Sequence, residues 1–147
     1  MRLYVSFDLE HDRDLHDLLL AQAGQAASAF TIASGSEAGD MTEAWVARVR
    51  LNMTEADEVV VICGEHTDDS RRVSAELKIA QEEHKPYVLL WGRREKMCKK
   101  PQSARGVDGM YGWTSAVLER QLADGLRRTR DREMSIKRRA ARTPQGT

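Results

Sequence analysis

Short runs of apolar and β-branched residues alternate along the chain with stretches in which apolar residues recur every three or four positions. The runs predict strands at residues 3–7, 29–33, 58–63 and 87–91. The stretches predict helices at residues 14–23, 41–53, 70–84 and 114–128. The run at 58–63 has no polar alternation, which is typical of a central strand covered on both faces of a parallel sheet.

Strands that alternate with helices form βαβ units, whose right-handed crossovers put helices on both faces of the sheet. We therefore expect an α/β fold: a flavodoxin-like, doubly wound parallel sheet of four to five strands. The polar stretch 92–112 should be a long loop that contains at most a short edge strand. Ligands of such folds bind at the carboxyl ends of the strands. The loops at residues 7–14, 33–40 and 64–69 converge there.

The length of 147 residues suits a single domain. We place this domain at residues 1–128, followed by a basic tail at 129–147 that is either helical or disordered. The 23 basic and 23 acidic side chains cancel, so no overall field attracts nucleic acid or membrane. The tail is either solvated or a partner-binding segment. It has no interleaved aromatic residue on which bases could stack, so nucleic acid is not an expected partner.

No apolar run approaches the ~20 residues of a membrane span, and the first residues lack the apolar core of a signal peptide. We expect a cytoplasmic protein that does not bind membranes. Cys63 and Cys98 form no CxxC motif, and the four histidines have no metal-binding spacing. Neither a metal nor a cofactor is expected.

Glu76 is a carboxylate on the apolar side of the predicted helix 70–84, in its first two turns. At ~100° per residue, it falls inside the stripe of Val73, Leu77 and Ala80. A charged side chain that faces the core needs a charged or hydrogen-bonding partner or a functional role, because burying an unpaired charge costs much free energy. Glu76 is either paired with an arginine such as Arg72 or Arg48, or it is a functional carboxylate near the predicted pocket.

Several enzyme classes lack their motifs in this sequence. No GxGxxG follows the first strand, and no GxSxG elbow is present. The acidic loop at residues 8–12 would repel a phosphate. Cys63 and Gly64 stand where a receiver domain would carry its phosphorylated aspartate.

Three stretches together resemble the TIR-like family known from Thoeris anti-phage systems. The first is RLYVSFDLEHDRDL at residues 2–15, and the second is VVVICGEHTDDSRRVSAEL at residues 59–77. The third is Lys85 and Pro86 followed by an apolar strand. The resemblance covers roughly residues 2 to 91, and the spacing of the elements is kept throughout it.

The resemblance implies a TIR-like fold and a protein that cleaves NAD, as its substrate, at the nicotinamide–ribose bond. It implies that Glu76 is the catalytic residue and that Phe7 lines the nicotinamide side. We also expect Asp8, Ser34 and Trp45 to contact the substrate. A cyclic or otherwise modified ADP-ribose would then signal to a partner effector.

Two other functions stay open. TIR-like folds also serve as non-enzymatic assembly modules, since a fold does not dictate function. A nucleoside deoxyribosyltransferase-like enzyme would share the α/β fold and a catalytic glutamate. The glycine-containing segment 33–40 has no large apolar anchor and should be able to move. We therefore expect little activity from isolated protein and more when a trigger or self-association completes the site.

Overall fold

Five parallel strands form a single sheet in this computed structural model, which describes residues 1–25 and 28–114. The strands are β1 (Arg2–Ser6), β2 (Thr31–Gly35), β3 (Glu58–Cys63), β4 (Tyr87–Trp91) and β5 (Met110–Gly112). The helices are α1 (Arg13–Ala23), α2 (Glu43–Glu55) and α3 (Arg71–Glu82), with a 3₁₀ turn η1 (Thr67–Asp69). The strand order β2-β1-β3-β4-β5 confirms the flavodoxin-like, doubly wound fold.

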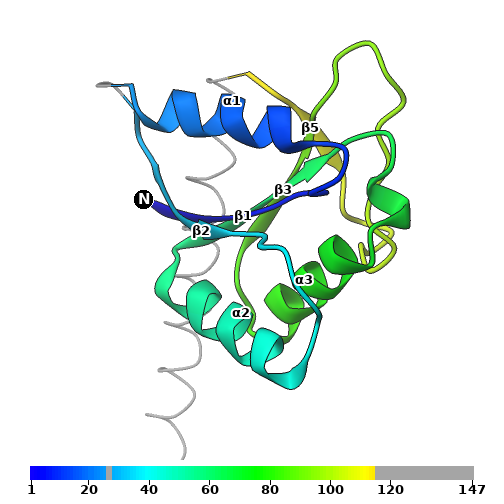
Figure 1. Ribbon diagram of the computed structural model, residues 1–147. Helices are drawn as coiled ribbons and strands as arrows, with labels where there is room; N and C mark the ends of the chain where they lie inside the picture. The colour runs from blue at the N-terminus through cyan, green and yellow to red at the C-terminus, as the bar shows by residue number, and fades with distance from the viewer. Residues whose placement is uncertain (26–27, 115–147) are drawn as a thin grey trace, which may run out of the picture.

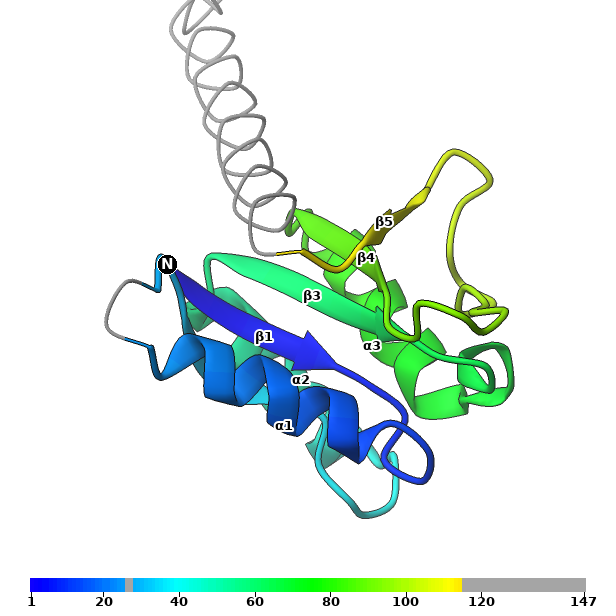
Figure 2. The ribbon, with the colours of Figure 1, turned by 90° about the horizontal axis from the view of Figure 1, so that it is seen from above.

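Helices cover both faces of the sheet, as the alternating pattern predicted. Figure 1 shows α1 on one face and α2 and α3 on the other, and Figure 2 shows the same layers from above. All six residues of β3 are buried, which confirms it as a central strand. The sheet therefore has an apolar core on each side. The α1 side includes Leu3, Val5, Leu15, Leu19 and Ile62. The α2–α3 side includes Tyr4, Val49, Met53, Val59 and Leu77.

Side-chain caps set the beginnings of the two helices on the second face. The backbone N–H of Trp45 donates to the Thr42 hydroxyl at 3.2 Å, and that of Val73 donates to the Ser70 hydroxyl at 3.2 Å. These bonds satisfy N–H groups that lack a partner within the helix. Met41, the first residue of the predicted helix 41–53, precedes α2 and is exposed.

The second strand lies two residues later than its apolar pattern predicted, at Thr31–Gly35 instead of 29–33. Its ends are set by pairing with β1, where the register shifts between Leu3 and Tyr4. The shift puts Ser34 opposite Tyr4 and Gly35 opposite Val5. A Cβ on Gly35 would lie 2.6 Å from the Val5 carbonyl oxygen, so only glycine fits there. Ser34 consequently belongs to the strand, not to the predicted loop.

The polar stretch after β4 is a long connection that ends in the short edge strand β5, as predicted. Parallel strands are usually joined through a crossover helix, and the connection between β4 and β5 has none among its residues. The predicted last helix, the domain boundary at residue 128 and the basic tail lie largely or wholly outside the described residues. Within those residues, no helix is long and apolar enough to cross a membrane.

Candidate functional site

Glu76 lies in the second turn of α3 with its side chain turned to the sheet and fully buried. The Tyr4 hydroxyl, from β1, donates a hydrogen bond to Oε2. The Ser36 hydroxyl lies 2.7 Å from Oε1 and 3.0 Å from Oε2. The carboxylate is thus held by two hydroxyl groups that come from β1 and from the end of β2.

The local folding of three segments brings these groups together. Val73, Leu77 and Ala80 are fully buried and fix the rotation of α3, so Glu76 faces inward with them. Tyr4 occupies the β1 position whose side chain points to the α2–α3 face. The register shift in β2 advances the chain by one residue, which delivers Ser36 to the carboxyl end of β1.

Burial raises the pKa of Glu76 to about 7, while the hydrogen bonds from Tyr4 and Ser36 and the charge of Arg72 act to lower it. Burial and the neighbouring carboxylate raise the pKa of Tyr4, so its phenol stays protonated and donates. Glu76 therefore changes its charge near neutral pH. A carboxylate of this kind is typical of functional sites.

The expected arginine partners do not contact Glu76. Arg72 lies over the Trp45 ring, 5.5 Å from its centroid, and donates to the Gly39 carbonyl. Arg48 is exposed on α2. The interpretation of Glu76 as one half of a buried ion pair is therefore wrong, because hydroxyl groups take the place of a guanidinium.

Ser36 closes the site over the carboxylate. Its hydroxyl also accepts a hydrogen bond from the Phe7 backbone N–H at 3.1 Å, and its own N–H donates to the Val5 carbonyl at 3.0 Å. These bonds fix the start of the β2–α2 loop to the end of β1. Glu76 is fully buried, so no ligand reaches it in this arrangement.

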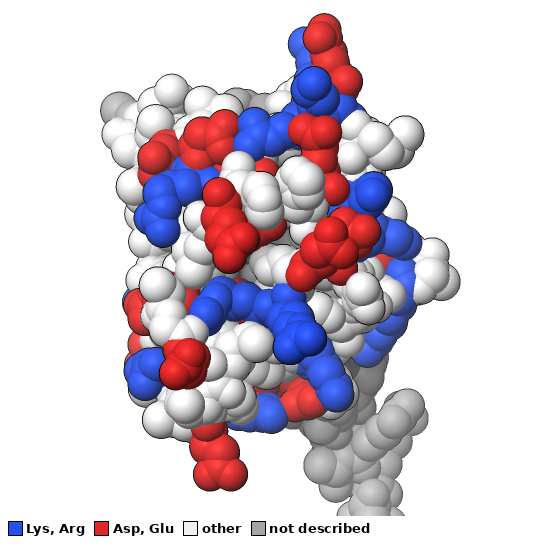
Figure 3. Space-filling model, turned by 45° about the vertical axis from the view of Figure 1, so that its right-hand side comes forward, with Lys and Arg blue, Asp and Glu red and all other residues white. Residues whose placement is uncertain are grey.

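A pocket of about 480 Å³ lies at the carboxyl edge of the sheet, and Glu76, Tyr4 and Ser36 are not among the residues that line it. It is lined by the β1–α1 loop, the β2–α2 loop and the segment between β3 and α3, so the predicted three loops do converge. Arg72, one turn before Glu76, lines the pocket at the α3 end. Figure 3 shows acidic and basic side chains mixed on this side of the molecule, with neither sign covering it alone.

The four predicted substrate contacts lie in different places. Asp8 lines the pocket, and its carboxylate accepts from the Glu10 N–H at 3.0 Å. Phe7 is buried and stacks on His16, with ring centroids 4.4 Å apart. Ser34 lies within β2, and Trp45 is buried beneath Arg72. In the closed arrangement, only Asp8 among these four faces the pocket.

Sequence reasoning missed Tyr4 and Ser36 as partners of Glu76. Tyr4 could have been found, because it is the one residue of the run 3–5 whose side chain needs a hydrogen-bond partner. Side chains alternate along a strand, so Tyr4 lies on the opposite face from Leu3 and Val5. Ser36 could not, because its place depends on the register shift in β2.

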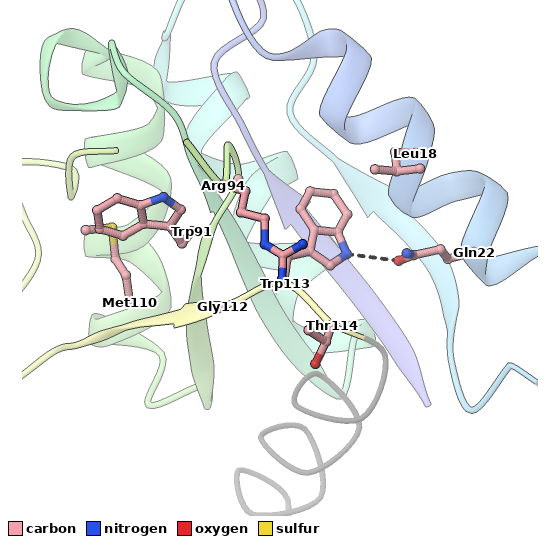
Figure 4. Close-up of a pocket in the computed structure, with 9 residues that line it drawn as sticks. Leu18, Gln22, Trp91, Arg94, Met110, Gly112, Trp113 and Thr114 are labelled. Atoms are coloured by element: carbon pink, nitrogen blue, oxygen red, sulfur yellow. Dashed lines mark hydrogen bonds between the residues drawn. The ribbon is translucent and has the colours of Figure 1, made fainter. Parts of the chain in front are cut away.

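A second cavity, of about 510 Å³, lies between α1 and the β4–β5 edge on the other face (Figure 4). Trp113 projects into it and donates to the Gln22 side chain at 3.0 Å. None of the described residues that line it is an acid or a histidine. Its described lining therefore offers no carboxylate or imidazole for acid–base catalysis, and Arg94 is its one charged side chain. Within residues 1–25 and 28–114, no three His, Cys, Asp or Glu side chains are grouped so as to bind a metal.

A second buried carboxylate, Asp12, lies where the chain enters α1. The Arg93 guanidinium donates to its Oδ1 at 3.1 Å, to Asp14 at 2.9 and 3.0 Å, and to the His11 carbonyl at 3.0 Å. Burial raises the pKa of Asp12, and Arg93 opposes that rise. This cluster ties the β4–β5 connection to the beginning of α1.

The sequence profile described as "Thoeris protein ThsB, TIR-like domain" matches residues 4–96. The chain belongs to this family. The matched range of the TIR-like domain runs from β1 to just after β4, so it contains Tyr4, Ser36 and Glu76. No curated protein sequence matches the chain significantly.

A solved structure described as a prokaryotic SEFIR domain is similar to this TIR-like domain, with a TM-score of 0.51 at 13% sequence identity. The similarity covers 86% of this chain and 90% of that one. At this identity it supports the fold alone.

Proposed function

We propose that this TIR-like protein cleaves NAD at the bond between nicotinamide and ribose, with Glu76 as the catalytic carboxylate. The observation that carries the proposal is a fully buried carboxylate at the carboxyl edge of the sheet, held by the hydroxyls of Tyr4 and Ser36. Membership in the Thoeris TIR-like family supports it. NAD is the substrate in this proposal and no cofactor is required.

The chemistry follows from the charge of the reacting groups. The N-glycosidic bond breaks, and its electron pair goes to the positively charged nicotinamide nitrogen, which becomes neutral. The ribose carbon is left as an oxocarbenium-like cation. An ionised Glu76 stabilises this cation and accepts hydrogen bonds from ribose hydroxyls. Water, a ribose hydroxyl or an adenine nitrogen then adds to the cation, giving a hydrolysed, cyclic or modified ADP-ribose that signals to a partner effector.

The hydroxyls of Tyr4 and Ser36 now occupy acceptor positions on Glu76 that ribose hydroxyls would use. Tyr4 belongs to the sheet, whereas Ser36 belongs to a loop connection. Opening of the β2–α2 loop would remove Ser36 and join the carboxylate to the 480 Å³ pocket. Isolated protein is therefore expected to cleave NAD slowly, and a trigger or self-association that moves the loop is expected to raise the rate.

Incubation of the full-length protein with NAD, and separately with 2′-deoxynucleosides, tests the proposal. We expect release of nicotinamide from NAD, with a rate per molecule that rises with protein concentration, and no base release from deoxynucleosides. Base release from deoxynucleosides without release of nicotinamide would favour a deoxyribosyltransferase-like enzyme. Release of neither base at any protein concentration would favour an assembly module.

A further inference from the structure

Two histidine rings are stacked in the wall of the pocket at the carboxyl edge of the sheet. His11, on the β1–α1 loop, and His66, just before η1, have ring centroids 4.1 Å apart and an interplanar angle of 27°. They come from loops that follow neighbouring parallel strands. Both rings line the pocket of about 480 Å³, and both also line an adjoining cavity of about 250 Å³. The pair therefore forms the wall between two open spaces.

The ring pair is held in place and still accessible. The Asp8 carboxylate lies 2.8 Å from His11 Nδ1 and fixes the orientation of that ring. Asp8 is itself nearly buried, whereas 44% of the His11 side chain remains exposed. His66 is exposed as well. Open faces of oriented, planar rings are suited to stacking on the π-face of a base.

The pocket has His11 and His66 in its lining as well as Arg72, which lies one turn before Glu76 on α3. The bond to be cleaved must lie at Glu76, so the nicotinamide riboside occupies the α3 end, beside Arg72. The diphosphate then lies by Arg71 and Arg72, because the acidic loop at residues 8–12 would repel it, and only the uncharged purine extends to the histidines of the far wall. A volume of about 480 Å³ lies within the range of ~300–1,000 Å³ usual for small-molecule sites.

We propose that the His11–His66 pair is the platform on which the purine base of the dinucleotide stacks. The proposal rests on the proposed function, since it assigns the second half of the same substrate. By stacking on the purine, His11 and His66 would make the protein bind dinucleotides more tightly than mononucleotides that lack a purine. Because both rings face open space, this platform is available while Ser36 still covers Glu76.

Binding of AMP tests the platform without any cleavage. Calorimetry on the full-length protein should show AMP bound at least about tenfold more tightly than ribose 5-phosphate, which lacks the base. His66→Ala should remove this difference, and His66→Phe, which keeps a planar ring, should retain it. Lys78→Ala, on the exposed side of α3, is the control and should behave as the unmodified protein. Equal binding of AMP by the unmodified protein and His66→Ala would overturn the proposal.

Kinetics provide the second readout. His66→Ala should raise the KM for NAD about tenfold, which corresponds to about 1.4 kcal/mol, with little change in kcat. The same variant should cleave nicotinamide mononucleotide, which has the scissile bond but no purine, as well as the unmodified protein does. If His66→Ala lost as much activity on nicotinamide mononucleotide as on NAD, the platform would be refuted and NAD cleavage would still stand. AMP binding that depends on His66 in a protein that releases no nicotinamide would refute the proposed reaction and leave the platform standing.

Discussion

Asp12 and Glu76 are both buried near the carboxyl edge of the same sheet, and their partners differ in kind. Asp12 receives a hydrogen bond from the Arg93 guanidinium, which also binds Asp14. Glu76 receives hydrogen bonds from the hydroxyls of Tyr4 and Ser36. The first carboxylate lies next to a permanent positive charge, whereas the hydroxyls around the second carry none.

Under the proposed function, this difference separates a structural carboxylate from the catalytic one. The Arg93 guanidinium opposes the rise that burial causes in the pKa of Asp12 and keeps this carboxylate engaged with the β4–β5 connection. Hydroxyls orient Glu76 without neutralising it, so burial raises its pKa to about 7. A carboxylate of this kind can respond to a cation that forms beside it, such as an oxocarbenium-like ribose. A buried acid near a pocket therefore has to be judged by its partners as well as by its burial.

The largest expected effect follows from removing the charge of Glu76. Glu76→Gln should reduce the release of nicotinamide from NAD at least about 100-fold, because an electrostatic stabiliser of the transition state is lost. The amide has nearly the same shape, so the variant should still fold, with a melting temperature close to that of the unmodified protein at about pH 4.5, where Glu76 is protonated. Rate and melting temperature measured on the same preparation check this prediction.

Asp12→Asn is the matched control for that variant. It removes the same charge from a carboxylate bound by Arg93, so it should lower the melting temperature and leave most of the cleavage rate. If Asp12→Asn lost as much activity as Glu76→Gln, the distinction between a structural Asp12 and a catalytic Glu76 would be contradicted.

The next effect concerns the stability of the Arg93 cluster. Arg93→Met should lower the free energy of unfolding by about 1–3 kcal/mol, because Asp12 would remain buried without its cationic partner. Urea denaturation of the variant and the unmodified protein measures the difference. Arg94→Met, at the neighbouring position, is the control. An unchanged midpoint for Arg93→Met would show that the cluster does not stabilise the fold.

A smaller effect on the cleavage rate is expected when the hydrogen bond between Ser36 and Glu76 is removed. Ser36→Ala removes the hydrogen bonds to Glu76 and to the Phe7 N–H, which should favour opening of the loop and raise the basal cleavage rate about tenfold. Thr54→Ala removes a hydroxyl that bonds only to the Arg50 carbonyl within α2 and should leave the rate unchanged. A rate that falls in Ser36→Ala would mean that Ser36 positions the carboxylate instead of shutting it off.

The smallest expected effect is a shift in pH dependence. Cleavage needs the ionised carboxylate, so the rate should fall as the pH drops through about 7. Tyr4→Phe removes a hydrogen bond that lowers the pKa of Glu76, so the midpoint should move to higher pH by up to about one unit. A pH–rate profile measures both midpoints. Identical profiles for the two proteins would exclude any effect of Tyr4 on the titrating group.

Stability should change with pH in the opposite direction. Because folding raises the pKa of Glu76 from 4.5 to about 7, its contribution is fully present below about pH 4.5 and is lost as the pH rises through about 7. Glu76→Gln should lack this part of the pH dependence. The difference in melting temperature between the two proteins, followed from pH 4.5 to 8, isolates it from other titrating groups.

The sequence predicted the elements of the fold where apolar patterning was strong. Residues 58–63 and 87–91 were assigned correctly because a strand buried on both faces has a continuous apolar run. The second strand was misplaced by two residues, because pairing and a register shift set its ends. The strand propensity of single residues contains no information on strand pairing or on a register shift.

The site was predicted only in part, for a similar reason. Glu76 was found because one carboxylate on an apolar helical stripe is visible in the sequence. Its partners were not, since Tyr4 and Ser36 lie 72 and 40 positions away and meet it only through the sheet. The stacked pair of His11 and His66 was missed too, because two loops far apart in sequence bring the rings together.

The central claim is that Glu76, covered by Ser36, is the carboxylate that cleaves NAD. The most direct measurement is the rate of nicotinamide release from NAD by full-length Ser36→Ala, alone and combined with Glu76→Gln. We predict that Ser36→Ala exceeds the unmodified protein about tenfold and that the double variant shows almost no release. A double variant that cleaves NAD as fast as Ser36→Ala would contradict the assignment of Glu76.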